Sequence, residues 1–292
     1  MHYHPIRHAG RLRTCLPPLL PALGVAMRMI RLICLIALAL AAVAAQPATA
    51  KMVAKPVDWT LDGTAFHSML VYDDAVQAKR PGLVMVPNWY GLTDIAVKKA
   101  EMIAGKDYVI LLTDMYGAKV RPTSDKEAMN AISPLLGDRA LMRKRIDYAL
   151  DQLKAQAKDA PIDPERLAAI GFCFGGGAVL DLARSGADVR AVISFHGILT
   201  TDKPELAKQI KARVLAMNGA DDEATMPDAN KFTDEMRMSP ADWQFAVMGH
   251  AVHCFTETEA TSATGNCRYN ATVAARSYKL MRLWLAESFA KS

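Results

Sequence analysis

Short apolar runs, each about the length of a buried strand, alternate with longer helical patterns along most of this chain. A repeated order of strand, loop and helix is typical of βαβ units, whose strands form a parallel sheet. We therefore expect an α/β fold with a mostly parallel central sheet and helices on both faces. The expected parallel strands cover residues 83–86, 108–113, 167–172, 191–195, 214–217 and 244–247, and the clearest helical patterns cover residues 125–130, 139–155 and 272–289.

A hairpin is expected ahead of these units. Strand-like segments at residues 59–61 and 69–72 flank the pair Asp62-Gly63, and Asp-Gly favours a tight two-residue turn. The two segments are predicted to be edge strands. In open α/β sheets ligands bind beyond the carboxyl ends of the strands, so the loops that follow the strands are where chemistry is expected.

The first fifty residues have the features of an export leader. A short basic start at residues 27–31 precedes an apolar run at 32–45, and Ala48-Thr49-Ala50 stands before Lys51. A basic start, a short apolar run and an Ala-x-Ala site are what a signal peptide requires. The alternative is an uncleaved anchor, although the run is short for a membrane span. We expect residues 1–50 to be a leader, with Met27 a candidate start, and the mature protein to be periplasmic or secreted.

The net charge of +5 also comes from this leader. Five of the 35 basic residues, all arginines, lie in residues 1–50, and no acidic residue does, so the remaining 30 basic residues balance the 30 acidic ones. A neutral mature chain gives no reason to expect nucleic acid as a partner. Residues 51–292 suffice for one large core, and we expect a single-domain monomer, free of the membrane after cleavage, that acts on a small molecule.

Three cysteines follow the leader: Cys173, Cys254 and Cys267. An oxidising compartment favours disulfides, and an odd number leaves one thiol over. Because Cys254 and Cys267 are near in sequence, one expectation is that they pair and Cys173 stays free. Three reduced cysteines are the alternative, and the sequence does not decide between the two.

A nucleophile elbow is predicted where the strand at 167–172 meets the next helix. Residues 171–175 read Gly-Phe-Cys-Phe-Gly, the pattern that places a nucleophile on a sharp strand-to-helix turn. The following helix presents N–H groups that stabilise a thiolate or an oxyanion. The segment lacks the glycine of a dinucleotide fingerprint and the Lys-Ser or Lys-Thr of a Walker A loop. A buried packing role is the alternative for Cys173.

A cysteine nucleophile needs a base and an orienting acid, and α/β hydrolases carry them in the order nucleophile, acid, histidine. Asp222 ends Gly219-Ala220-Asp221-Asp222, which follows the strand at 214–217. Asp221 is the alternative acid. His250 and His253 lie beyond this loop, whereas His196 precedes it and is expected to be structural. The histidines form no metal-ligand pattern, so no metal is expected.

Several segments together resemble the dienelactone hydrolase family. They are Gly-Phe-Cys-Phe-Gly-Gly-Gly from 171, Asp-Met-Tyr-Gly from 114, the Gly-x-x-Asp loop, Ala-Val-His-Cys-Phe-Thr from 251 and Tyr-Asn-Ala from 269. The resemblance covers about residues 57–290. It implies an α/β-hydrolase fold, a Cys-Asp-His triad and cofactor-free hydrolysis of lactones or esters, of the carboxymethylenebutenolidase type.

The resemblance also assigns roles. Cys173 would be the nucleophile, His253 the base and Asp222 the orienting acid, working through an acyl-enzyme. The backbone N–H groups of Trp89 and Phe174 would form the oxyanion hole.

The substrate pocket departs from the family pattern. Tyr116 resembles a residue that lines the pocket, but Asn88 stands where the archetype has a glutamate that helps to form the thiolate. Of the two arginines that hold a substrate carboxylate in the archetype, one falls near Ala118, with Lys119 and Arg121 as possible stand-ins. The other falls at Glu257, which has the opposite charge. A neutral or differently charged ester is therefore at least as good a candidate as an anionic diene-lactone.

Two other functions remain open from the sequence. The fold could be retained as a catalytically silent binding module, which the residues at positions 88 and 257 would explain. Thiol redox chemistry between Cys173 and Cys254 is the third possibility.

Overall fold

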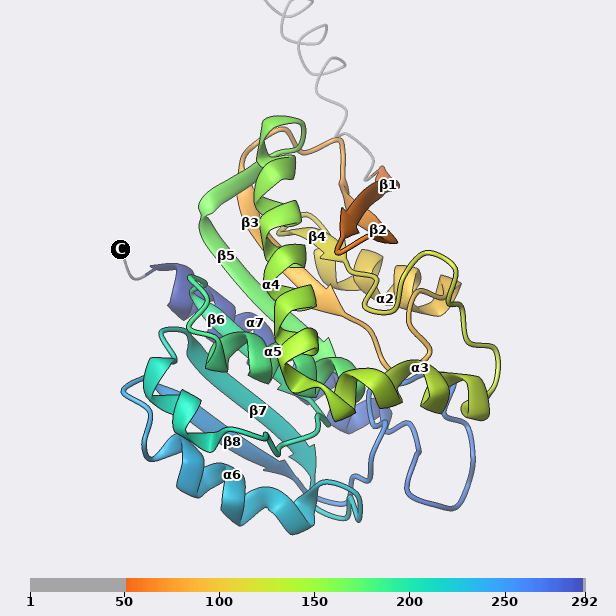
Figure 1. The fold of residues 1–292 in the computed structure, drawn as a ribbon, viewed down its shortest axis with the longest axis vertical. Coiled ribbons are helices and arrows are strands. Elements are labelled where there is room, and N and C mark those ends of the chain that lie inside the picture. Colours follow the sequence, from red (N-terminus) through yellow and green to blue (C-terminus); the bar gives the residue numbers. More distant parts are fainter. Residues whose placement is uncertain (1–50, 291–292) are drawn as a thin grey trace, which may run out of the picture. The chain divides into compact units, whose positions relative to one another are not determined.

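The computed structural model describes residues 51–290, and the expected leader, residues 1–50, lies outside them (Figure 1). The strands are β1 (Met52–Leu61), β2 (Thr64–Asp73), β3 (Arg80–Val86), β4 (Val109–Leu112), β5 (Ile162–Phe172), β6 (Ala191–Phe195), β7 (Arg213–Gly219) and β8 (Trp243–Met248). The helices are α2 (Asp94–Ala104), α3 (Asp125–Gly137), α4 (Arg139–Ala155), α5 (Phe174–Arg184), α6 (Ala229–Met236) and α7 (Ala271–Ala290), with short 3-10 helices η1 (Gln156–Lys158), η2 (Pro204–Gln209) and η3 (Met226–Asp228).

These strands form one eight-stranded sheet in the order β1-β2-β4-β3-β5-β6-β7-β8. Every pair from β4 through β8 is parallel, and only the pairs made by β2 are antiparallel. The predicted α/β fold with a mostly parallel sheet is confirmed. Its parallel strands all end at the same edge, so the loops that follow them share one side of the molecule.

The N-terminal hairpin has the predicted turn, but only one of its strands is an edge strand. Asp62 and Gly63 both have positive φ, 50° and 76°, as a two-residue hairpin turn requires. β1 lies at the edge and accommodates Pro56 there, because an edge strand can lack one N–H donor. β2 instead lies between β1 and β4, since it also pairs with β4; its prediction as an edge strand is wrong.

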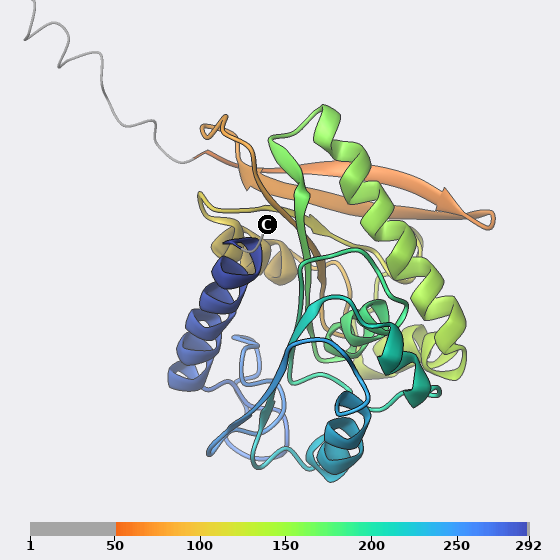
Figure 2. The same ribbon diagram turned by 90° about the vertical axis from the view of Figure 1, so that its left-hand side faces the viewer.

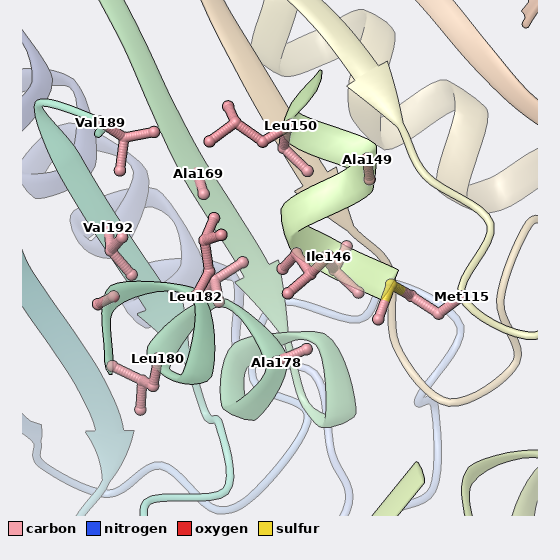
Figure 3. Close-up of a cluster of buried hydrophobic side chains, with 14 of the residues drawn as sticks. Met115, Ile146, Ala149, Leu150, Ala169, Ala178, Leu180, Leu182, Val189 and Val192 are labelled. Atoms are coloured by element: carbon pink, nitrogen blue, oxygen red, sulfur yellow. The ribbon is translucent and has the colours of Figure 1, made fainter. Parts of the chain in front are cut away.

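Helices cover both faces of the sheet (Figure 2). Buried side chains of α2 and α7, such as Ile103 and Trp284, pack on one face, and those of α3 to α6 pack on the other. Figure 3 shows part of the second core, where Ile146 and Leu150 of α4 meet α5 and the sheet. Burying one such aliphatic side chain stabilises the fold by about 1.5–3 kcal/mol.

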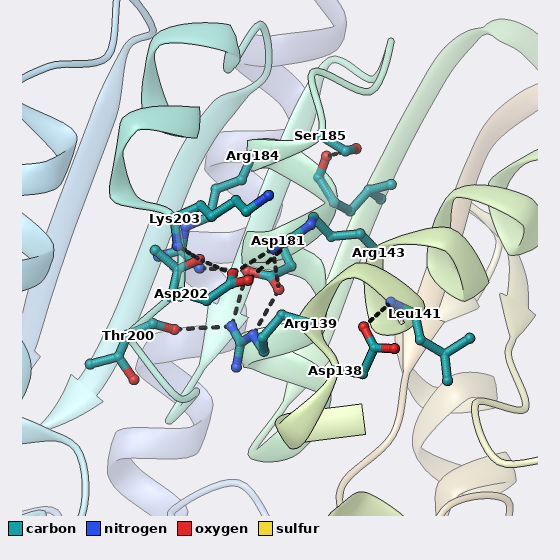
Figure 4. A network of polar contacts seen from close by, with 12 residues as sticks. Asp138, Arg139, Leu141, Arg143, Asp181, Arg184, Ser185, Thr200, Asp202 and Lys203 are labelled. Atoms are coloured by element: carbon teal, nitrogen blue, oxygen red, sulfur yellow. Dashed lines mark hydrogen bonds and ion pairs between the residues drawn. The ribbon is translucent and has the colours of Figure 1, made fainter. Parts of the chain in front are cut away.

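A buried network of charged side chains joins α5 to the neighbouring helices (Figure 4). The fully buried Asp181 carboxylate accepts hydrogen bonds from Arg139 Nε at 2.9 Å and Arg184 Nη1 at 2.9 Å. Arg184 also donates to Glu235 of α6 at 2.7 Å, and Arg143 of α4 reaches Asp181. The network joins α4, α5 and α6, and so holds the helix that begins at the predicted elbow.

Helix boundaries differ from the sequence expectation in identifiable ways. The expected helix at 125–130 continues through Pro134 to Gly137. α2 was not singled out from the sequence, although Thr93 caps it by accepting a hydrogen bond from Ala96 N at 3.1 Å. No helix within residues 51–290 has the length and apolar character needed to cross a membrane.

Candidate active site

Cys173 occupies a sharp turn between β5 and α5. Its φ is 53°, a left-handed conformation that a residue with a side chain adopts only under local constraint. A Cβ on Gly171 would lie 2.1 Å from the carbonyl oxygen of Gly175, and one on Gly175 would lie 2.2 Å from that of Val86. Only glycine fits at either position, which gives the predicted elbow its physical basis.

The loops after β7 and β8 bring an acid and a histidine to this turn. His253 Nε2 lies 3.1 Å from Cys173 Sγ, and His253 Nδ1 lies 2.8 Å from Asp222 Oδ2. The half-buried Cys173 is a free thiol. Cys173, His253 and Asp222 therefore form one continuous hydrogen-bonded chain, as the order of the residues predicted. Asp221 and His250, the alternatives, are exposed.

Four donors converge on the buried Asp222 carboxylate. Besides His253, Thr225 Oγ1 donates to Oδ2 at 2.6 Å, while Ala224 N and Asn266 Nδ2 donate to Oδ1 at 3.0 and 3.1 Å. Burial would raise the pKa of Asp222, but the hydrogen bonds from His253, Thr225 and Asn266 lower it to about 2. The acid therefore stays ionised and can hold a positive charge on His253.

The imidazole of His253 favours its charged form. Burial alone would lower the pKa of His253, but its contacts with Asp222 and Cys173 raise it to about 10. His196, expected to be structural, behaves in the opposite way. Burial, together with the positive charges of His253 and Lys99, holds the pKa of His196 well below its ordinary value. His196 Nε2 lies 2.7 Å from Thr256 Oγ1, and the centre of its ring lies 5.1 Å from that of the His253 ring.

A disulfide links Cys254 to Cys267, as one of the two sequence expectations proposed. Because Cys254 is bonded to Cys267, it is not available for thiol exchange with Cys173, which removes the basis for the redox alternative. The disulfide instead links Cys254, which follows His253, to Cys267, which follows Asn266, a hydrogen-bond donor to Asp222.

Trp89 and Phe174 are the two residues whose backbone N–H groups were predicted to form an oxyanion hole. Phe174 is the first residue of α5, and the first turn of a helix leaves its N–H groups without intrahelical acceptors. Trp89 belongs to the loop after β3, and its carbonyl accepts the Tyr116 hydroxyl at 2.9 Å. Neither the Trp89 nor the Phe174 N–H donates to another group among the hydrogen bonds of residues 51–290.

Asn88 is held within the protein. Its Nδ2 donates to Glu257 Oε2 at 2.7 Å, and its Oδ1 accepts from Tyr90 N at 3.0 Å. Glu257 is buried and forms a 2.6 Å ion pair with Lys99, whose ammonium lies 4.4 Å from the centre of the Phe172 ring. Asn88 therefore orders the loop that carries Trp89. The Glu257 carboxylate pairs with Lys99 inside the protein, at the position where the archetype has an arginine for a substrate carboxylate.

Tyr116 and Lys119 line a cavity whose other lining residues come from residues 120–145 and include none of Cys173, Asp222 and His253. The buried Tyr116 ring lies 5.7 Å from the Phe174 ring. Burial raises the pKa of the Tyr116 hydroxyl above its ordinary value. The cavity has a volume of about 510 Å³, and Lys119, Arg121 and Leu135 also line it. Arg121 is paired with Asp114 at 3.3 Å, whereas the exposed Lys119 and Arg145, which also lines the cavity, form no ion pair within residues 51–290.

Three residues that touch the site were not found from the sequence: Lys99, Thr225 and Asn266. Lys99 lies on the buried side of α2, where helical periodicity could have marked it. Thr225 follows Asp222 by three residues, a spacing common in loops that carries no special signal. Asn266 lies 44 residues beyond Asp222, and no local pattern connects the two. In residues 51–290 no cluster of His, Cys, Asp or Glu side chains is arranged to hold a metal ion.

The parallel sheet, the elbow at the end of β5 and the histidine and acid loops at the ends of later strands together define an α/β hydrolase. The comparisons with known proteins name the group within that class. A model of the dienelactone hydrolase family matches residues 66–289. The chain belongs to the dienelactone hydrolase family.

Solved structures and a sequence relative agree with this placement. The structure named m3DLH is 36% identical with a TM-score of 0.76, and the match covers 81% of this chain and 98% of that one. A dienelactone hydrolase-like promiscuous phosphotriesterase, P91, from metagenomic libraries is also 36% identical, with a TM-score of 0.75 over 82% and 99% of the two chains. A probable 2-oxo-3-(5-oxofuran-2-ylidene)propanoate lactonase of Bradyrhizobium sp is 27% identical over 69% of this chain and 84% of its own length.

Proposed function

We propose that this hydrolase cleaves carboxylic ester or lactone bonds with Cys173 as nucleophile, His253 as acid and base, and Asp222 as the residue that orients His253. The observation that carries the proposal is the continuous chain from Cys173 Sγ to His253 Nε2 at 3.1 Å and from His253 Nδ1 to Asp222 Oδ2 at 2.8 Å. These lengths are those that nucleophile activation requires.

The proposed reaction has two halves. In the first, the Cys173 thiolate attacks the substrate carbonyl carbon, and the N–H groups of Trp89 and Phe174 hold the resulting oxyanion. The bond to the leaving oxygen then breaks, and His253 donates its proton to that oxygen. In the second half, His253 takes a proton from water, the hydroxide attacks the thioester, and the carbon–sulfur bond breaks. The acid leaves and the thiolate returns.

An ion pair present before substrate binds would replace the role of the missing glutamate. In the archetypal family member a glutamate stands at the position of Asn88, and the Asn88 amide cannot accept a proton as that glutamate does. The contacts of Asp222 and Cys173 raise the pKa of His253 to about 10, against the effect of burial. At neutral pH His253 would then be charged while it lies 3.1 Å from Cys173 Sγ.

The charges around the site favour a neutral substrate. Glu257 is buried against Lys99, and Arg121 pairs with Asp114. At the cavity beside Tyr116 the remaining cations are Lys119 and Arg145, and the carboxylate of Glu127 lines it as well. We therefore expect a neutral ester or lactone to be a better substrate than a dicarboxylate or an anionic diene-lactone.

Phosphotriesters are a second candidate substrate class. They are neutral, their phosphoryl oxygen could occupy the same N–H pair, and the relative P91 is described as a promiscuous phosphotriesterase. An aryl phosphotriester therefore belongs in the substrate panel beside aryl esters and lactones.

The test is a substrate screen on the exported protein with Cys173→Ala as control. We expect turnover of a small activated aryl ester, and loss of at least about 10³-fold of that rate in the variant. Unchanged turnover in Cys173→Ala would exclude the proposed nucleophile. Tight ligand binding with no turnover of any ester, lactone or phosphotriester would instead favour the silent binding module.

The cellular form is also part of the proposal. A leader at residues 1–50, followed by one domain at residues 51–292, would place the enzyme in the periplasm or outside the cell, as a monomer. The Cys254–Cys267 disulfide supports this location, because disulfides persist in oxidising compartments.

A further inference from the structure

One short segment contacts both the acid and the base of the site. Residues 266–270, here called the strap, run beside the His253 loop before α7 begins. Arg268 N donates to the His253 carbonyl at 3.1 Å, and Cys267 pairs with His253 in a parallel β-bridge. Asn266, at the start of the strap, lies against Asp222. The strap thus contacts both loops of the site, which are also joined directly by the hydrogen bond from Asp221 N to the Ala251 carbonyl at 2.9 Å.

The side-chain amide of Asn266 is held in a single orientation. Its Nδ2 donates to Asp222 Oδ1 at 3.1 Å, while its Oδ1 accepts from Glu223 N at 3.0 Å. Turning the amide over would place its oxygen against the carboxylate and its NH₂ against a backbone N–H. Asn266 therefore always presents a donor to Asp222, on the oxygen that His253 does not use.

The disulfide connects this arrangement to the histidine. Cys267 follows Asn266 directly, and Cys254 follows His253 directly. Cys254 is buried with a φ of 63°, so its backbone has little freedom. A covalent bond therefore links the neighbour of the base to the neighbour of a residue that holds the acid. Cys267 is exposed, which leaves the bond accessible to a reductant.

We propose that Asn266 is a positioning residue for the Asp222–His253 pair, and that the Cys254–Cys267 disulfide holds Asn266 in place, so that activity depends on this bond. The proposal rests on the proposed function, because it concerns the orientation of the same acid and base. The side chain of Asn266 is hydrogen-bonded to Glu223 N and Asp222 rather than to Cys173; it acts by keeping the Asp222 carboxylate turned toward His253.

Reduction of the disulfide would release the strap. A water-soluble phosphine reduces the bond with two electrons, the two sulfurs take up two protons, and the phosphine takes its oxygen from water to become the phosphine oxide. Two thiols, Cys254 and Cys267, result. Since no thiol is added, Cys173 forms no mixed disulfide, and any loss of rate reports on the strap alone.

The first test is Asn266→Ala, with Thr261→Ala as its control on the same exposed loop. We expect kcat for the aryl ester to fall about tenfold, which is what one hydrogen bond to a charged group is worth. KM should stay the same. The alkaline limb of the kcat/KM profile should move to lower pH, because a less firmly held Asp222 stabilises the His253 imidazolium less. Thr261→Ala should match the wild type. An unchanged kcat and pH profile in Asn266→Ala would overturn the proposal.

The second test is a double-mutant cycle between the strap residue and the disulfide. Cys254→Ala/Cys267→Ala should lose kcat by a similar factor, and adding Asn266→Ala to it should cost little more, because the two changes remove the same restraint. The phosphine should lower the wild-type rate toward that of the cysteine variant and leave the variant itself unaffected. Full additivity of the two changes, or a wild-type rate insensitive to complete reduction, would contradict the role of the disulfide.

A measurement without turnover separates this inference from the proposed function. The pH dependence of Cys173 alkylation by iodoacetamide, followed on its own peptide by mass spectrometry, reports on the Cys173–His253 pair directly. If no ester is hydrolysed but Asn266→Ala still slows alkylation at neutral pH, the function fails and the positioning role stands. If esters are hydrolysed through Cys173 and neither alkylation nor kcat responds to Asn266→Ala, the positioning role fails alone.

Discussion

Replacing Asp222 by asparagine changes one atom of the site, and the structure predicts how the new amide would sit. His253 and Thr225 donate to Oδ2, and Ala224 N and Asn266 donate to Oδ1. An NH₂ group in either place meets two donors. The Ala224 N–H is fixed in the backbone, whereas the imidazole can exchange tautomers and the Thr225 hydroxyl can rotate.

The amide of Asp222→Asn should therefore turn its NH₂ toward His253. The imidazole then carries its proton on Nε2, facing Cys173, and can no longer accept a proton from the thiol. Where an Asp→Asn exchange forces the wrong histidine tautomer, the loss is about 10⁴-fold in kcat, which corresponds to about 5 kcal/mol of barrier. We expect a loss of 10³- to 10⁴-fold here, with little change in stability because the shape is conserved.

The assay is aryl-ester hydrolysis from pH 5 to 10, with alkylation of Cys173 measured alongside. Asp221→Asn is the matched control, because Asp221 is the exposed neighbour and should keep wild-type activity. The pKa of His253, about 10 in the wild type, should fall in Asp222→Asn, so that alkylation at pH 7 slows as well. Retention of more than about a tenth of the wild-type kcat by a folded Asp222→Asn variant would refute this reasoning.

Three further predictions concern stability, pH and export. Lys99→Met leaves the buried Glu257 unpaired and should cost about 3–5 kcal/mol in urea unfolding, whereas exposed Lys98→Met should stay within about 0.5 kcal/mol; equal effects would contradict the buried pair. Because the folded pKa of His253, about 10, lies above its ordinary value of 6.5, its charge contributes stability below pH 6.5 that is lost as pH rises through 10. His253→Gln should therefore lose less Tm than the wild type between pH 7 and 10.5, and an equal loss would count against the raised pKa. Expression of the full chain in a Gram-negative host should give periplasmic protein that begins at Lys51 by N-terminal sequencing, and a cytoplasmic product that retains the upstream residues would contradict the leader.

Much of the fold could be predicted because its sequence signals are local. Apolar runs such as residues 83–86 and 214–217 mark strands that are buried on both faces. Their alternation with helical segments indicates that these strands run parallel. The place of β2 could not be predicted, because its pairing with β4 depends on contacts between residues about forty positions apart.

The site shows the same division between local and distant signals. The elbow around Cys173 has a sequence pattern because glycine alone fits beside it. Asp222 and His253 follow strands, so their order along the chain predicted their meeting. Asn266 has no such signal, since its contact with Asp222 arises only when the chain returns along the strap.

From the sequence, Asn88 and Glu257 were visible only as departures from the family pattern. The residue that balances Glu257 is Lys99, which comes from α2, and nothing in the spacing of these residues connects them. The packing of α2 on the sheet creates the pair, so its chemical meaning depends on the tertiary structure.

Direct observation of the acyl-enzyme is the most direct test of the central claim, that Cys173 is the nucleophile. The exported protein is mixed with an aryl ester, quenched in acid within the first turnovers, and digested for mass spectrometry. The account predicts that the peptide bearing Cys173 gains the mass of the acyl group, and that Cys173→Ala gains none and turns over no ester. An acyl group on any other residue, or hydrolysis that proceeds in Cys173→Ala, would contradict it.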